Sequence, residues 1–520
     1  MYWRHSCRSR LRDLCPKAMY GQRPSQHPPL TAPERIRFFS KPVLPGVVWP
    51  RCRRVLDPRR FTSRSVVVLF AGNIAFALLP ESVPAQGGAG GVVQSHAGSR
   101  LTLVDAVRRG LEQYPSVRAA RAATDQANAG IHGAAAARLP SLALSASATQ
   151  YEEPMLVTPI HGLSTREAPP FDETLVQGAA TMSYTLFDGG ARGARIRRAR
   201  ESAAAAEATR AGTEHAIVAR VTAAYVEIQA RRQIVDAHDH RLGALSAELS
   251  RARQRFDAGR APQVEVLRAE AALASAQAER VRFGEALDLA ERELARLTGA
   301  REEETRAARL APIRLADSLL LPRPSLLEAA RDASPSLTRA RAMAAAADAD
   351  VSLARSARWP EIKLTAGYYQ RGSADTRSWG EWAAGTSLSL PLFTGGAINA
   401  DVARSRAGRR EAEEALRLGE LQVAQELDGA LSAVAEAHAR QASLTAAATR
   451  FAEVARIQKL ALDAGSGTQT DYLIAEADLL ASRASLAEAT MSEIIARAEL
   501  ARVTGQLNIA WVQRVIESSP

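Results

Sequence analysis

The chain has 520 residues and a formal net charge of +11 at pH 7. Residues 1–85 hold 15 Lys and Arg against 4 Asp and Glu, which is the whole excess, and the rest of the chain holds 52 of each sign. A nucleic-acid-binding protein needs a clustered basic face. The neutral body supplies none, so we expect no nucleic-acid partner.

Residues 1–85 have the layout of an N-terminal extension followed by a secretory signal. Several arginines precede an apolar run from Val66 to Leu79, and small residues, Val83 and Ala85, stand just before Gln86. A basic region, a short apolar region and small residues at a cleavage site are typical of secretory signals. A buried strand or helix over the apolar run is the alternative. We interpret residues 1–58 as sequence upstream of a mis-set start codon.

All three cysteines, Cys7, Cys15 and Cys52, precede the expected cleavage site. The mature chain would therefore contain no disulfide and no thiol chemistry. Beyond the signal, no apolar run approaches the ~18 residues of a membrane-spanning helix. We expect no transmembrane helix, no cofactor and no metal.

Residues 86–100, rich in Gly, Ser and Gln, are expected to form a flexible leader. From Thr102 to Leu139 the chain is rich in alanine with helical spacing. Pro115 suits the first turn of a helix, with Tyr114 outside it. The sequence therefore predicts two helices, one on each side of Tyr114.

Alternating apolar and small polar residues predict a strand over residues 142–149 and another over 180–186. A Pro-rich polar loop is expected between them, over 152–177. The same alternation recurs at 362–368 and 384–390. Strands of about ten residues suit a tilted membrane strand. A half-buried soluble hairpin is the alternative, although lone hairpins are marginally stable.

Each predicted hairpin ends in a Phe-x-Gly-Gly turn that breaks the strand before a helix. The turn residues are Phe187, Gly189 and Gly190 in the first copy and Phe393, Gly395 and Gly396 in the second.

Residues 191–257 contain no proline and predict one continuous helix of ~100 Å, longer than any globular domain allows. Six apolar residues recur in it at intervals of seven: Val221, Ile228, Val235, Leu242, Leu249 and Phe256. A strict heptad predicts a supercoiled partner helix. A shorter helix over 263–298 follows, and together with 102–139 it roughly matches the long helix in length.

The chain carries an internal duplication. Phe187, Gly259 and Gly299 recur 206 positions later, whereas Pro115 and Pro140 recur 220 positions later. We therefore divide the mature chain into repeats at 101–300 and 325–510, a linker at 301–324 and a C-terminal tail at 511–520.

These residues resemble the TolC family of outer-membrane efflux proteins over about 101–510. The resemblance depends on three doubled motifs: Leu-Phe-x-Gly-Gly at 186–190 and 392–396, an Ala-Gly turn at 258–259 and 464–465, and Thr-Gly at 298–299 and 504–505. It implies a mixed α and β membrane protein. Three chains would form a homotrimer in which each contributes four strands to a 12-stranded β-barrel in outer-membrane lipid. The barrel would continue as a long periplasmic α-helical coiled-coil tunnel.

The resemblance also implies a passive exit duct of a Gram-negative bacterium rather than an enzyme. Its partners would be a periplasmic adaptor (membrane fusion) protein and an inner-membrane pump of RND or ABC type, in efflux or in type I secretion. A coiled-coil scaffold protein without transport activity is the alternative outside the family. No nucleophile elbow, phosphate loop or dinucleotide fingerprint is present. In the pair His238 and His240, positions i and i+2 do not share a helix face, which disfavours a metal site.

Glu265 and Asp471 each lie six residues after a turn glycine, where the family carries acidic residues that face the pore. Three copies would crowd these carboxylates around one constriction, and such rings favour cations. The alternative is that both are first-turn acids stabilised by a helix N-terminus. Ile474 and Gly467 stand where better-studied members have a further acid and an arginine, so gate bonds built on those residues are not carried over.

Nine residues around the two turns resemble the groove in which the adaptor docks: Arg255, Phe256, Gly259, Val264, Leu267, Leu462, Gly465, Thr470 and Leu473. Packing within the coiled coil is the alternative for each. Six aromatic residues of the strands and loops resemble the girdles that mark membrane interfaces: Tyr151, Tyr184, Tyr368, Tyr369, Trp379 and Trp382.

We expect the mature protein to begin at or near Gln86, because Val83 and Ala85 fit the signal-cleavage pattern. N-terminal sequencing of the membrane-localised protein measures this directly. A first residue before Val66 would contradict the signal.

Overall fold

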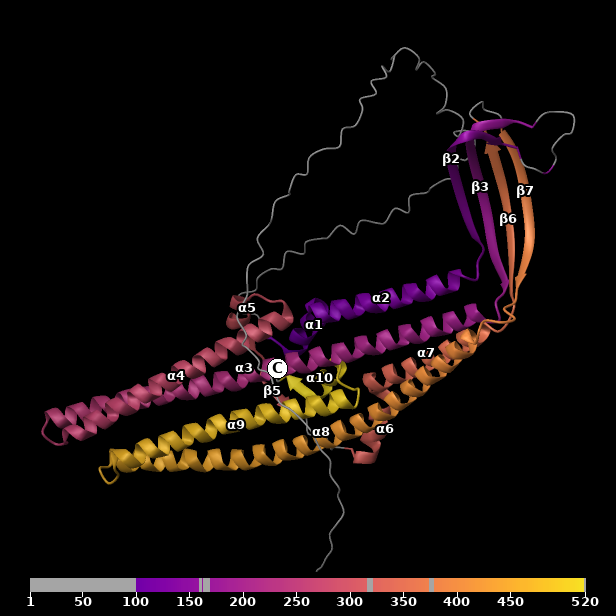
Figure 1. The fold of residues 1–520 in the computed structure, drawn as a ribbon. Coiled ribbons are helices and arrows are strands. Elements are labelled where there is room, and N and C mark those ends of the chain that lie inside the picture. Colours follow the sequence, from indigo (N-terminus) through magenta and orange to yellow (C-terminus); the bar gives the residue numbers. More distant parts are fainter. Residues whose placement is uncertain (1–99, 159–160, 162–168, 316–320, 374–377, 519–520) are drawn as a thin grey trace, which may run out of the picture. The chain divides into compact units, whose positions relative to one another are not determined.

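The computed structural model describes residues 100–158, 161, 169–315, 321–373 and 378–518 (Figure 1). The expected signal, its cleavage site and nearly all of the expected leader lie outside the described residues.

One series of elements occurs twice along the chain. The first is α1 (Leu103–Gln113), α2 (Pro115–Ala136), β2 (Ser141–Leu156), β3 (Phe171–Phe187), α3 (Ala191–Asp257) and α4 (Gln263–Thr298). The second is α6 (Arg323–Ala333), α7 (Pro335–Ser356), β6 (Glu361–Gly372), β7 (Ser378–Ser389), α8 (Ala397–Asp463) and α9 (Gln469–Val503). The helices predicted over 191–257 and 263–298 are confirmed to the residue. Both α3 and α8 have 67 residues.

Local signals explain where the helices start. The Thr102 side chain accepts a hydrogen bond from the Asp105 backbone N–H at 3.1 Å, which caps α1. Pro115 and Pro335 occupy the first turns of α2 and α7, where a missing N–H costs nothing.

The linker and the tail contain more structure than the sequence indicated. The described part of the linker contains α5 (Glu302–Ala307), β4 (Arg309–Leu310) and β5 (Ile313–Leu315), and the described tail residues lie in α10 (Ile509–Val515) and β8 (Ile516–Ser518). β4 pairs in parallel with β1 (Arg100–Leu101), and β5 pairs antiparallel with β8. Trp511 and Val512 are buried in the main core. These pairings join segments far apart in sequence, which local patterns do not register.

Four strands form one antiparallel sheet in the order β2-β3-β6-β7, side by side in Figure 1. β2 and β3 have 16 and 17 residues, so the prediction of strands of about ten residues and of a loop over 152–177 is wrong for this hairpin. Pairing resumes beyond an irregularity between Gln150 and Met155. Pro154 lies there, on an edge strand that tolerates a missing donor.

The register brings most apolar residues of the four strands onto one face. Leu142 lies opposite Met182, and Ala180 lies opposite Tyr368, which in turn lies opposite Trp382. The other face carries mainly small and polar residues: Ser141, Ser145, Ser147, Thr181, Ser183, Thr365 and Ser387.

The aromatic residues of the strands do not form one group. Tyr368 and Trp382 lie on the apolar face, 52% and 79% exposed. Tyr369 and Trp379 are at odd positions of the same strands and therefore belong to the opposite face. The expectation of one girdle is therefore wrong for Tyr369 and Trp379, and for the aromatic residues on the apolar face it stays a prediction.

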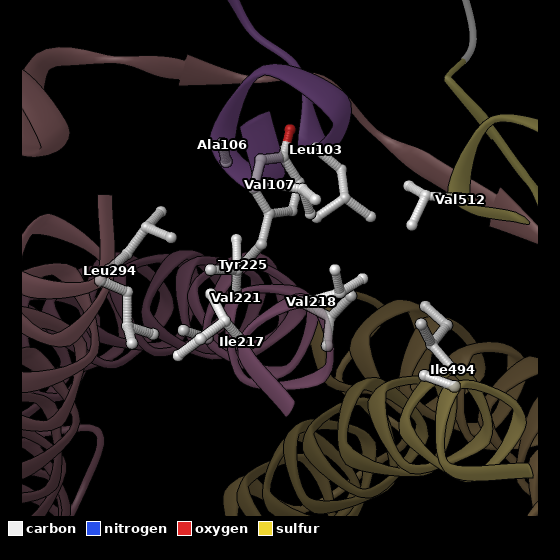
Figure 2. Close-up of a cluster of buried hydrophobic side chains, with 14 of the residues drawn as sticks. Leu103, Ala106, Val107, Ile217, Val218, Val221, Tyr225, Leu294, Ile494 and Val512 are labelled. Carbon is white, nitrogen blue, oxygen red and sulfur yellow. The ribbon is translucent and has the colours of Figure 1, made fainter. Parts of the chain in front are cut away.

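The main hydrophobic core lies midway along α3 and gathers α1, α4, α9 and α10 around it (Figure 2). Val221, Tyr225 and Ile228 of α3 are fully buried, as is Leu294 of α4. Within the heptad Leu242 is half-buried, Leu249 is buried again, and Phe256 is 43% exposed in the single chain.

Three polar side chains of α3, spaced by one helical turn, hold the linker against this core. The Tyr225 hydroxyl lies 2.7 Å from the Leu101 carbonyl oxygen and 3.0 Å from that of Ala311. The amide of Gln229 also donates to Ala311. Arg232 donates to the Ala308 carbonyl at 3.0 Å and to Glu291 at 2.7 Å. We call Tyr225, Gln229 and Arg232 the belt residues.

Leu294→Ala should destabilise the protein, because it opens a cavity in a fully buried site. Large-to-small core substitutions cost about 2–5 kcal/mol. Leu294→Met keeps the volume and should cost under about 1.5 kcal/mol. Loss of helical circular dichroism on heating the detergent-solubilised protein measures both. Equal losses for the two variants would show that Leu294 is not tightly packed.

Candidate functional site

Each long helix ends in a tight turn, which we call a tip. The first tip joins α3 to α4 through Gly259, whose φ is +67°. The helix end is closed by backbone hydrogen bonds from Gly259 to the Phe256 carbonyl at 2.8 Å and from Arg260 to the Arg255 carbonyl at 2.7 Å. A glycine in the left-handed region after a helix satisfies the last carbonyls without a side-chain clash. The turn is therefore a defined structure.

Glu265 lies in the first turn of α4 and forms an ion pair with Arg255 of α3 at 3.5 Å. Its side chain is 26% exposed. The Glu265 carboxylate thus faces α3, and the Arg255 guanidinium partly neutralises its charge.

The second tip joins α8 to α9 through Gly465, whose φ is +75°. Thr468 caps α9: its hydroxyl accepts from the Asp471 N–H at 3.1 Å and donates to the Asp471 carboxylate at 2.7 Å. Asp471 therefore lies in the first turn of α9, held by the Thr468 cap, which agrees with the alternative of a first-turn acid, while its place in a pore ring stays a prediction. Asp471 is exposed, so its hydrogen bonds with Thr468 leave the carboxylate accessible to solvent. Across the described part of the chain, no hydrogen bond or ion pair joins Glu265 to Asp471.

The nine residues expected at the docking groove divide between the two tips. On the first tip Phe256, Val264 and Leu267 expose 43%, 47% and 54% of their surfaces. On the second tip Leu462 and Leu473 are half-buried and Thr470 is exposed. Among these nine residues, the exposed apolar surface thus lies on the first tip, while Leu460 and Ile474, which are not among them, are each 55% exposed beside the second.

A polar cluster that sequence reasoning missed connects the two helix pairs near the tips. Arg251 of α3 forms an ion pair with Asp463 at the end of α8, at 3.2 Å, and lies 3.7 Å from Glu248. The Glu248 side chain is only 5% exposed. The only sign of this cluster in the sequence is the position of Glu248 directly before the heptad residue Leu249.

Tyr472 of α9 is buried beside this cluster. Burial, reinforced by the nearby Glu476 and Glu248 carboxylates, raises the pKa of Tyr472 to about 12. It therefore stays a neutral phenol in ordinary conditions. A cavity of about 340 Å³ opens beside it between α3, α8 and α9, with four basic or imidazole side chains in its lining: His240, Arg241, Lys459 and Arg483.

His238 and His240 lie on different faces of α3. His238 is buried and stacks on Phe283 with ring centroids 4.6 Å apart, and burial lowers its pKa. His240 is exposed and lines the cavity. No group of three or more His, Cys, Asp or Glu side chains able to hold a metal occurs among the described residues.

The two strand-to-helix turns differ in their side chains. Asp188 accepts from the Gly190 N–H at 3.2 Å and from the Arg192 N–H at 2.8 Å, and also pairs with the Arg192 guanidinium. Thr394 replaces Asp188 in the second copy. Phe187 is 41% exposed and Phe393 is 90% exposed. The second turn is therefore the more open one in the single chain.

No helix in the described part of the chain is long and apolar enough to cross a membrane.

Comparison with known proteins gives a consistent result. The family model described as outer membrane efflux protein matches residues 106–300 and 326–506. Protein CyaE of Bordetella pertussis is 29% identical over 326 residues, which are 60% of this chain and 65% of that protein. The outer membrane protein TolC of Vibrio cholerae is 24% identical over 302 residues, 56% of this chain and 65% of that protein. The matched stretch thus spans slightly less than two thirds of these curated relatives.

Solved structures share the fold over more of the chain. VceC of Vibrio cholerae, an outer membrane protein, superposes with a TM-score of 0.63 at 22% identity, covering 78% of this chain and 96% of that one. The CmeC outer membrane channel of Campylobacter jejuni gives a TM-score of 0.66 at 18% identity, covering 78% and 85%.

The family and the fold are those of channel proteins. Because the family model matches well over half of the chain, in both of its halves, the chain belongs to the TolC-type outer membrane efflux protein family and is located in the outer membrane with an extension into the periplasm.

Proposed function

We propose that the protein is the exit duct of a tripartite export system, a homotrimer that passively conducts cargo delivered by an inner-membrane pump through a periplasmic adaptor. The observation that carries this proposal is the four-stranded sheet. Its outer strands β2 and β7 are both open edges, and one face is mostly apolar. Neither feature is tolerable in a solitary chain.

Strand direction supports closure by further copies. Neighbours alternate antiparallel throughout β2-β3-β6-β7, so the β7 of one copy and the β2 of the next would also run antiparallel. Three copies would give twelve strands, an even number, as closed antiparallel barrels of this kind have. Closure removes the unpaired edges.

The two faces of the sheet support the placement of lipid and lumen. Leu142, Leu144 and Leu388 expose 66–78% of their surfaces on the apolar face, which suits acyl chains. The serines and threonines of the opposite face suit a water-filled interior. A coiled-coil scaffold without transport activity has no use for such a sheet.

The tips are the proposed contact with the adaptor, and Glu265 and Asp471 the proposed gate carboxylates. The apolar surface of Phe256, Val264 and Leu267 supports docking of a partner helix. The repetition of one element series supports an internal duplication. OpmQ of Pseudomonas aeruginosa, a relative 32% identical over 45% of this chain, is named as a pyoverdine export outer membrane protein. Export of small molecules is the first candidate, and type I secretion of proteins is the second.

We expect a heat-labile trimer in outer-membrane fractions, because four strands cannot close a barrel. Native mass measurement of the detergent-purified protein, before and after heating, checks the number of copies. A stable monomer at the start would rule out the tunnel.

We expect Glu265→Gln combined with Asp471→Asn to reduce the cation selectivity of the channel, because clustered carboxylates raise the local cation concentration. Asp471 should account for the larger share, since Arg255 already pairs with Glu265. The effect should shrink with added salt, because the Debye length is ~10 Å at 0.1 M. Planar-bilayer conductance in a salt gradient measures the selectivity.

Glu285→Gln is the matched control, an exposed carboxylate on the same helix α4 about 30 Å further along. It should leave selectivity unchanged. If the double variant behaves like this control, the two acids only stabilise helix ends.

A further inference from the structure

The cavity of about 340 Å³ between α3, α8 and α9 is separate from the residues proposed for the gate and for adaptor docking, none of which lines it. On α3 it is reached at His240, about 28 Å before the first tip. The small side chains of Ala237 and Ala244 on the same face of α3 leave the space open. The cavity is thus formed where the first helix pair meets the second.

The side chains around this cavity carry an excess of positive charge. Arg241 of α3, Lys459 of α8 and Arg483 of α9 each bring a full positive charge to the lining. Among the described residues that line it, Glu476 is the single carboxylate. A hollow lined mainly by one sign of charge raises the local concentration of the opposite ion. The cavity therefore attracts anions.

Two of these cations have no partner in the part of the chain that the structure describes. Neither Lys459 nor Arg483 forms a hydrogen bond or an ion pair there. Arg241 donates to Glu279 of α4 at 3.1 Å, which uses one of the five N–H groups of its guanidinium. Unused donors thus come from all three helices around the cavity.

Carboxylates close to the cavity in sequence are engaged elsewhere. Asp239, next to His240, accepts a hydrogen bond from Arg280 at 2.8 Å. Asp463, one turn beyond Lys459, pairs with Arg251 at 3.2 Å. These acids leave the positive charge of the cavity uncompensated.

The internal duplication shows how the same positions are arranged where there is no such cavity. With the offset of 206, Lys459 and Glu476 correspond to Arg253 and Glu270. Arg253 and Glu270 form an ion pair at 2.7 Å. Lys459 and Glu476 both line the cavity instead, and Lys459 is left without an ion pair in the described part of the chain.

The other two cations are specific to their half of the chain. The counterpart of Arg241 is Ala447, and the counterpart of Arg483 is Gln277. Because the corresponding helices form with neutral residues at these positions, the repeated fold does not require a basic side chain there. A ligand is the remaining reason for their convergence on one cavity.

We propose that this cavity binds a small oxyanion with two or more negative charges, of the phosphate or polycarboxylate type, through Arg241, Lys459 and Arg483. Arginine binds such groups with pairs of parallel hydrogen bonds, and lysine adds a point charge. The Tyr472 hydroxyl is a further donor in the lining. All of these side chains belong to one chain, so the site goes beyond the proposed duct and does not depend on it.

A bound anion would connect the two halves of the chain. Arg241 belongs to the first repeat, whereas Lys459 and Arg483 belong to the second. The anion would therefore stabilise the packing of the first helix pair against the second. Because a ligand that binds only the folded protein stabilises it, binding should raise the temperature of unfolding.

Binding and thermal stability, measured together on the full chain in detergent, test the proposal. The probes are inorganic phosphate and citrate, each compared with chloride at equal pH and ionic strength. Equilibrium dialysis should show saturable binding of phosphate, citrate or both at one site in each chain. The midpoint of helix loss on heating, followed by circular dichroism, should rise over the same concentration range.

Lys459→Gln combined with Arg483→Gln should weaken binding by about tenfold or more for each charge removed, because hydrogen bonds between charged groups are the strong ones. Both residues are exposed, so the midpoint in chloride should stay near that of the unaltered protein. Lys459→Arg keeps the charge and should retain binding.

Arg440→Gln combined with Arg450→Gln is the matched control, which removes two exposed positive charges from α8 outside the cavity. Arg450 lies nine residues before Lys459, which places it on the opposite side of the helix. This control should bind the anion like the unaltered protein. The site is overturned if neither oxyanion shows saturable binding, if the cavity variant binds normally, or if the control loses as much affinity as the cavity variant.

Discussion

The structure depends on one constraint: a four-stranded sheet with an apolar face must be closed and covered. The sheet has open edges at β2 and β7 and exposes leucines and aromatic side chains across one face. Unpaired strand edges and bare apolar surface are both costly in water. Lipid against that face and further copies at the edges would meet both costs. The long helices α3 and α8 each begin directly after a strand of this sheet, so the sheet fixes where they start.

The sequence was sufficient for the long helices and insufficient for the segments between them. Helix α3 was predicted to the residue because Gly190 and Gly259 bound a stretch free of proline. Pro154 concealed the extension of β2, because a proline on an edge strand looks locally like a loop. The pairing of β5 with β8 depends on residues two hundred positions apart, which carry no local signal.

For the candidate site, sequence spacing located the tips, the turn glycines and the two acids, but not their partners. Thr468, three residues before Asp471, is a helix cap that could have been recognised from residue type and spacing alone. The ion pair of Arg251 with Asp463 could not, because it depends on how two helix pairs are rotated against each other. The roles of Glu265 and Asp471 in a pore stay predictions.

The belt residues divide α3 into a part that leads from the sheet to the core and a part that leads from the core to the first tip. From Tyr225 to Asp257 the helix runs about 48 Å beyond the point where the linker is hydrogen-bonded to it. A tilt of about 10° at that point would move the far end of the helix by about 8 Å at that arm length, which is roughly the spacing between the axes of two packed helices. A small change in packing around Tyr225 would therefore displace the turn between α3 and α4 far more than the core itself.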